Sequence, residues 1–299
     1  MTSLLVQLGG VVFNALLVIV DVRSGGVPLG VRGRIRGVTV MDLFTGVIHG
    51  VWCPSPWSPR KSIMKAAAKR VYDKVAVRAK SATEFIVLLD KRELKTPAKK
   101  VLTLPTHALA SAVALEWEAQ DRFIRPATMP LMKLATTTID QVPSIRPTME
   151  DSMMRSLESD LVCFRTDEEP TLLAKEDACF SPLITWCAKE MDLPLAVSSD
   201  LSLSHPPETM PRAAEILEEA DDWELAALDQ ACNSSKSFVV ALALCKGFIG
   251  SADAVSTARV AEQHQIDEWG EVEAGHDLDA ADIAVRIGAC SAFLRLLGR

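Results

Sequence analysis

The sequence lacks the cysteine motifs that mark zinc ribbons and disulfide-bonded scaffolds. Its seven cysteines are odd in number and scattered along the chain, and none of them forms a C-x-x-C pair. This pattern argues against both classes and indicates a protein of a reducing compartment. Cys187 and Cys245 lie in apolar stretches, where we expect a thiol to be a small buried hydrophobic group.

Signatures of phosphate binding and of a serine nucleophile are also missing. The segment "GFIGSAD" at Gly247–Asp253 has neither the Lys-Ser/Thr pair nor the preceding strand of a phosphate loop. Three serines lie close to Lys236, but no G-x-S-x-G elbow surrounds them. These segments therefore offer neither a phosphate-binding loop nor an activated serine nucleophile.

After the first part of the chain, acidic residues outnumber basic ones. Residues 1–70 hold nine Lys/Arg against Asp21 and Asp42, a net charge of +7, whereas the whole chain carries -7 and the remainder therefore carries -14. A nucleic-acid groove needs a basic face that neutralises phosphates. We therefore expect no nucleic-acid partner and favour a protein partner with basic patches.

The first residues have no charged side chain. Residues 1–20 approach the length of a membrane span, but glycines and polar residues interrupt them and no Lys or Arg precedes them. Membrane association is therefore not expected. Residues 1–20 are the one segment through which it could occur. An arginine-rich, proline-containing stretch follows, so residues 1–68 are predicted to be a targeting leader and linker, disordered or removed. Alternatively, residues 1–63 come from a wrongly placed start, with Met41 or Met64 as the true one.

Short alternating or apolar runs follow from Val71. "KVAVRA", "EFIVLLD" and "KVLTLP" predict antiparallel strands. Thr106 then precedes a run of helical period and is the expected N-cap of a long helix. After Pro126 the period is helical almost to the end. Helices are predicted near residues 131–140, 148–163, 178–191, 209–219, 222–231, 236–247, 251–269 and 278–297.

These patterns predict an α+β fold in which a small N-terminal antiparallel β domain precedes a larger α-helical bundle. The predicted boundaries are residues 69–130 for the β-rich domain with the first long helix, and residues 131–299 for the α-helical domain. No internal repeat of fixed period is found.

Histidines and carboxylates are concentrated in "EQHQIDEWGEVEAGHD" at residues 262–277. His264, His276 and Asp277 loosely resemble the ligands of histidine-aspartate metal phosphohydrolases. The chain has too few further histidines to complete such a metal site, so a solvated acidic face with helix-end capping is favoured. A metal-dependent phosphohydrolase that uses these three residues is kept as the alternative function.

Three blocks resemble a known family. Residues 89–140 contain "EWEAQ" and "MPL", Ser159–Arg165 reads "SDLVCFR", and residues 262–277 contain "WGEVEAGHD". Together they resemble the F-type ATP synthase assembly chaperones that hold the free alpha subunit, over roughly Arg70–Leu297. One departure is Lys91, which follows "LD" where the family usually has glycine.

The resemblance implies a non-enzymatic, monomeric chaperone of the mitochondrial matrix, with a plastid address as the alternative, and with no metal or cofactor. Its client would be the unassembled alpha subunit of the ATP synthase catalytic head, protected on its beta-facing surface until assembly. Residues implied in client binding are Trp269, Glu271, Glu273, His276 and Asp277. Residues implied in structural or interface roles are Glu116, Trp117, Gln120 and Asp160.

Overall fold

The computed structural model describes residues 34–35, 38–39, 68–200, 202–272 and 275–299. The chain divides into two units, Met1–Ile63 and Met64–Arg299. In the first unit, strands β1 (Arg34–Ile35) and β2 (Val38–Thr39) pair in antiparallel fashion. The remaining residues of the predicted leader up to residue 67 lie outside the described residues, and so does the prediction on membrane association, which concerns residues 1–20.

An antiparallel sheet opens the described part of the second unit. Its four strands are β3 (Val75–Ala79), β4 (Phe85–Leu89), β5 (Arg92–Glu93) and β6 (Thr103–Leu104). β4 is central: β3 pairs with it along its whole length, and the short β5 and β6 pair with its opposite ends. The alternation of the sequence places Val75, Val77 and Val87 against the apolar core.

The turn between β4 and β5 explains how the chain does without the family's glycine. Leu89 pairs with Arg92, so only Asp90 and Lys91 form the turn. The positive φ of 56° falls on Asp90, a residue type that tolerates it, and not on Lys91. The Asp90 carboxylate also accepts the backbone N–H of Lys74 at 2.9 Å, which fixes the turn.

Helices make up most of the remaining chain. The described residues contain α2 (His107–Glu118), α3 (Pro130–Asp140), α4 (Val142–Glu158), α5 (Pro170–Glu190), α6 (Thr209–Glu219), α7 (Asp222–Ser235), α8 (Phe238–Cys245), α9 (Ser251–Ala258), α10 (Val260–Trp269) and α11 (His276–Leu296), with 3-10 turns η1 (Pro126–Thr128) and η2 (Leu161–Cys163). The predicted fold class, a small antiparallel sheet followed by a helical bundle, is confirmed.

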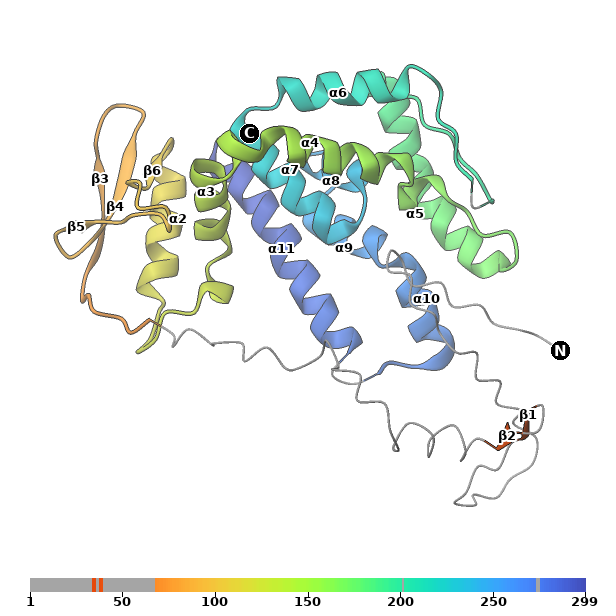
Figure 1. The fold of residues 1–299 in the computed structure, drawn as a ribbon, viewed down its shortest axis with the longest axis horizontal. Helices are drawn as coiled ribbons and strands as arrows, with labels where there is room; N and C mark the ends of the chain where they lie inside the picture. Colours follow the sequence, from red (N-terminus) through yellow and green to blue (C-terminus); the bar gives the residue numbers. More distant parts are fainter. Residues whose placement is uncertain (1–33, 36–37, 40–67, 201, 273–274) are drawn as a thin grey trace. The chain divides into compact units, whose positions relative to one another are not determined.

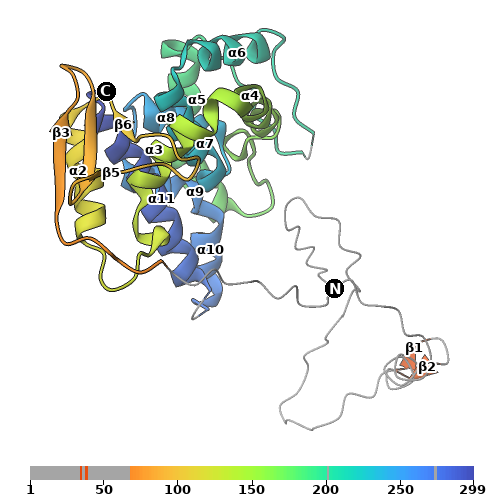
Figure 2. The same cartoon turned by 60° about the vertical axis from the view of Figure 1, so that its left-hand side comes forward.

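Helix α8 lies at the centre of the bundle. Residues 238–244 are all buried, because α4, α5, α7, α9 and α11 pack around this short apolar helix. Figures 1 and 2 show the sheet and α2 at one end of this unit and α5 and α10 towards the other. The Thr106 hydroxyl caps α2 at Leu109 N and donates to Leu296 O at 2.6 Å, which joins α2 to the end of α11.

Prolines shift several helix boundaries from their predicted positions. α4 and α5 each carry proline at the first or second helical position, where a missing N–H costs nothing, so both helices begin earlier than expected. The predicted helix at residues 251–269 is broken at Arg259 into α9 and α10. The predicted domain boundary at residue 130 stays a prediction. Of the helices described, none is long and apolar enough to cross a bilayer.

Candidate functional site

The end of α10 and the start of α11 expose apolar and acidic side chains together. α10 ends at Trp269, and Gly270 follows with a φ of 86°, which turns the chain away from the helix. Trp269 is 71% exposed, Val272 61% and Leu278 62%. Around them lie the exposed carboxylates of Glu271 and Asp277. We call this set the α10–α11 surface; Glu273, also predicted to bind the client, lies outside the described residues.

Backbone and side-chain hydrogen bonds hold the two helix ends together. Val272 N donates to His276 Nδ1 at 3.3 Å, so His276 folds the connection locally. Arg259 donates to His276 O at 3.0 Å and to both carboxylate oxygens of Glu262 at 2.8 and 2.9 Å. That bidentate pair lowers the pKa of Glu262 and raises the pKa of Arg259. The ion pair therefore positions the start of α11.

The histidines of this region do not converge on a metal. His264 is buried, and its Nδ1 lies 3.5 Å from the ammonium of Lys175, which also forms an ion pair with Asp267 at 2.7 Å. His276 is occupied by Val272. In the described part of the chain, no three His, Cys, Asp or Glu side chains could hold a metal ion. The alternative phosphohydrolase function is therefore not supported.

Glu116 acts within the fold as a cap for another helix. Its two carboxylate oxygens accept Leu131 N and Met132 N, each at 2.8 Å, in the first turn of α3. A carboxylate at a helix N-terminus stabilises the exposed N–H groups there. Burial raises the pKa of Glu116, and these two hydrogen bonds lower it in part. Glu116 therefore joins α2 to α3.

Gln120 closes the same connection. Its side-chain nitrogen donates to Glu116 O at 2.9 Å and to Thr128 Oγ1 at 3.1 Å, and its oxygen accepts Arg125 N at 2.7 Å. Gln120 is only 4% exposed. The spacing of "EWEAQ" and "MPL" in the sequence thus corresponds to one hydrogen-bonded link between α2 and α3.

Trp117 lies against the chain segment that leads into the sheet. Its ring packs edge to face with Tyr72, with 5.8 Å between ring centroids, and the Tyr72 hydroxyl donates to Trp117 O at 2.7 Å. The indole nitrogen is buried and has no acceptor among the described residues. Trp117 and Trp269 thus have opposite environments, although carboxylates flank both in the sequence.

Asp160 is fully buried at the start of α8. Its carboxylate accepts the Ser237 hydroxyl at 2.7 Å, Val239 N at 3.0 Å and Val162 N at 3.0 Å. Burial raises the pKa of Asp160, and its hydrogen bonds oppose that shift. Because one carboxylate serves both η2 and α8, Asp160 fixes the position of the central helix.

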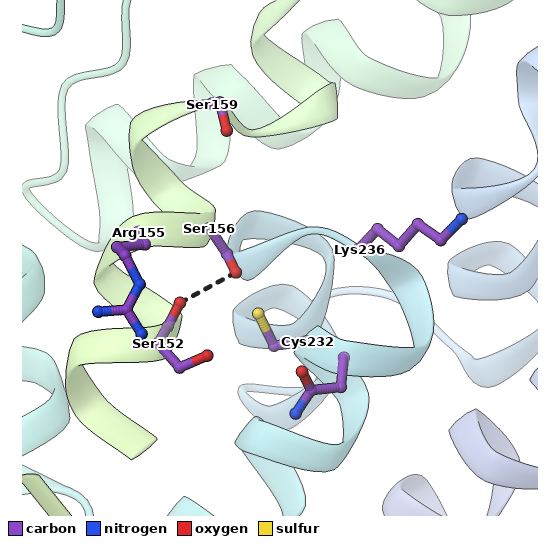
Figure 3. A pocket seen from close by; sticks show the side chains of 7 residues that line it. Ser152, Arg155, Ser156, Ser159, Cys232 and Lys236 are labelled. Carbon is purple, nitrogen blue, oxygen red and sulfur yellow. Dashed lines mark hydrogen bonds between the residues drawn. The ribbon is translucent and has the colours of Figure 1, made fainter. Parts of the chain in front are cut away.

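A polar cavity of about 370 Å³ lies between α4 and α7 (Figure 3). Its lining residues are Ser152, Arg155, Ser156, Ser159, Cys232, Asn233 and Lys236. Burial raises the pKa of the Cys232 thiol to about 12, so it is protonated near neutral pH. None of the lining side chains is a carboxylate or an imidazole, and Lys236 is the one lysine among them.

Two members of the α10–α11 surface, and the arginine that positions the start of α11, were not found from the sequence. Val272 and Leu278 are apolar residues that an amphipathic pattern would assign to a core, and only the structure leaves them exposed. The ion pair of Arg259 with Glu262 could have been predicted, because the two residues are three positions apart in a segment predicted to be helical.

The chain is similar to known chaperones over most of its length. Residues 69–188 match a family described as ATP12 chaperone protein. The mitochondrial protein atp12 of Schizosaccharomyces pombe is 24% identical over 260 residues, which cover 82% of this chain and 89% of that protein.

Solved structures share the fold. Atp12 from Paracoccus denitrificans is 29% identical, with a TM-score of 0.71 over 77% of this chain and 98% of that one. A protein from Agrobacterium tumefaciens, named as a candidate chaperone, is 28% identical, with a TM-score of 0.71 over 77% of this chain and 86% of that one. The family resemblance predicted from the three sequence blocks is confirmed. The chain is therefore similar to ATP12 chaperones in sequence over residues 69–188 and in fold over most of its length.

Proposed function

We propose that the protein binds the unassembled alpha subunit of the ATP synthase catalytic head and protects the surface of that subunit that faces beta. A free alpha subunit exposes apolar area meant for its neighbour, and exposed patches of that kind drive aggregation. A chaperone that covers this area and leaves when beta replaces it needs no chemical step. The proposed activity is therefore binding without catalysis, by a monomer.

The observation that supports this proposal best is the exposure of Trp269 at 71%, beside Val272 and Leu278 and among carboxylates. Exposed tryptophans are frequent anchors of protein interfaces, and neighbouring charges steer the partner and set its orientation. We propose that Trp269, Glu271 and Asp277 contact the client, with Glu273 on the same connection, and that His276 keeps this connection folded.

We further propose that the protein acts in the mitochondrial matrix. The S. pombe relative is described as mitochondrial, and the arginine-rich, acid-poor composition of the first seventy residues fits an organelle address. The client subunit is needed at the site where the catalytic head is assembled.

Co-expression with the alpha subunit tests the proposal. Wild-type chain is expected to raise the amount of soluble alpha and to co-purify with it. Glu271→Lys and Trp269→Ala are expected to lose co-purification while keeping their own melting temperature. Glu218→Lys reverses a charge at an exposed position of α6 and is the matched control, which should behave as wild type.

Two results would contradict different parts of this proposal. If wild-type chain leaves alpha insoluble and does not co-purify with it, alpha is not the client. If wild type captures alpha and Glu271→Lys and Trp269→Ala capture it equally well, the client binds elsewhere on the chaperone.

A further inference from the structure

The sheet and the helices of the second unit carry opposite charge. Residues 69–100 hold ten Lys/Arg against four Asp/Glu, a net charge of +6, whereas residues 101–299 hold 15 against 33, or -18. The sheet lies at one end of this unit (Figure 1). Because charges in physiological salt are screened over about 8 Å, a surface that approaches this end meets mainly the positive charge.

The positive charge is concentrated in the segment that follows β4. Lys91, Arg92, Lys95 and Lys99 are all exposed, and none of them forms an ion pair with another described residue. Lys100 differs, because its ammonium donates to Ile139 O at 2.8 Å. We call the first four residues the basic loop; its charges are available to a partner.

The basic loop is held in a fixed position by α3. Asp140, the last residue of α3, accepts the Thr96 hydroxyl at 2.8 Å and Ala98 N at 3.0 Å. Thr96 in turn accepts Lys100 N at 3.2 Å. The loop therefore presents its cations from an ordered backbone, which lowers the entropy cost of binding.

Few exposed apolar side chains accompany these charges: Val71, which precedes β3, is 85% exposed. In the part of the chain that the structure describes, none of the exposed large hydrophobic side chains lies between residues 72 and 114. A specific protein interface is centred on apolar anchors, and a single-strand nucleic-acid site needs exposed aromatic rings. A lipid bilayer with anionic headgroups needs neither, because clustered Lys and Arg are attracted to its surface potential.

We propose that the basic loop docks the protein peripherally on an anionic phospholipid surface, with the acidic helical bundle turned away from the membrane. This surface is separate from the α10–α11 surface, and the proposal does not depend on the identity of the client. Each exposed cation near such a surface strengthens binding about fivefold. Binding weakens as salt is added, because it is electrostatic.

Flotation of the full chain with vesicles tests the proposal. The chain should float with equimolar phosphatidylcholine and phosphatidylglycerol and much less with phosphatidylcholine alone. Changing Lys91, Arg92, Lys95 and Lys99 together to Gln should reduce binding by more than a hundredfold. Changing the three lysines to Arg keeps the charge and should keep the binding, which separates charge from folding.

A local readout distinguishes the basic loop from the first seventy residues. A photo-crosslinking amino acid at Ala98, beside the loop, should react with lipid, whereas one at the exposed Ala214 of α6 should not. Equal flotation of the Gln variant and wild type, without lipid crosslinks at Ala98, would overturn the proposal. So would the absence of flotation together with salt-sensitive self-association that the Gln variant abolishes, since the occupant would then be a second copy.

Discussion

The Ser237 hydroxyl donates a hydrogen bond of 2.7 Å to the buried carboxylate of Asp160, across 77 residues of chain. Ser237 Oγ also accepts Val240 N and so caps α8, while Asp160 Oδ2 accepts Val239 N. Two side chains thus satisfy the first turn of a helix that has no solvent around it. The block "SDLVCFR" therefore has a structural role, because its Asp160 holds the first turn of α8.

Asp160→Ala is expected to lower the free energy of unfolding by about 3 kcal/mol or more, because it leaves three buried donors without an acceptor. Ser237→Ala is expected to cost about 1 to 2 kcal/mol through the lost cap. Urea unfolding of both single variants and the double variant measures their coupling. Additive losses would show that the two residues act independently.

Glu116→Ala is expected to destabilise the protein by about 2 kcal/mol, since Leu131 N and Met132 N lose charge-assisted hydrogen bonds. Glu118→Ala is the matched control: Glu118 lies two residues away on α2 with an exposed side chain. Its change should stay within about 0.5 kcal/mol. Thermal melting compares the pair, and equal losses would show that helix propensity, not capping, is responsible.

Trp117→Ala and Trp269→Ala are expected to separate stability from binding. Loss of the Trp117 ring, which packs on Tyr72, should cost about 3 kcal/mol. Trp269 is 71% exposed, so its loss should change stability by less than about 0.5 kcal/mol while client capture falls. The measurements are melting temperature and alpha co-purification. A Trp117→Ala melting curve like that of wild type would assign this ring to an interface instead.

Arg259→Lys is expected to weaken client capture with little change in stability. Lysine cannot hold Glu262 with two parallel hydrogen bonds and reach His276 O at once, so the start of α11 loses its fixed position. Arg286→Lys is the control, because Arg286 forms an ion pair with Asp282 in which both side chains are exposed. Capture of alpha by the two variants is compared; equal capture would show that Arg259 does not position the client-binding surface.

Buried thiols are expected to resist labelling in the native protein. Burial raises the pKa of Cys187, Cys232 and Cys290 to about 12, so at pH 8 these groups are protonated and weakly nucleophilic. Cys179 is partly exposed and should react first among these four. Mass spectrometry after brief treatment with a maleimide gives the order. Rapid labelling of Cys187 in the folded protein would show that α5 opens.

Local patterns were sufficient for much of the fold. Alternating residues predicted β3, an apolar run predicted β4, and Thr106 was correctly placed as the cap of α2, because strands and caps depend on neighbours a few residues away. The start of α4 lies at Val142 and not near residue 148 as predicted, because proline is compatible with the first turn of a helix. The client-binding role of the α10–α11 surface stays a prediction.

The sequence by itself determined the order of the elements, the unequal charge and the resemblance to ATP12 chaperones. Only the tertiary structure decided what each conspicuous side chain does. Trp117 and Trp269 have similar acidic neighbours in the sequence, yet one packs on Tyr72 and the other is exposed. The physical reason is that burial depends on which distant elements pack together: α2 lies against the sheet, whereas α10 ends where no other described element covers it.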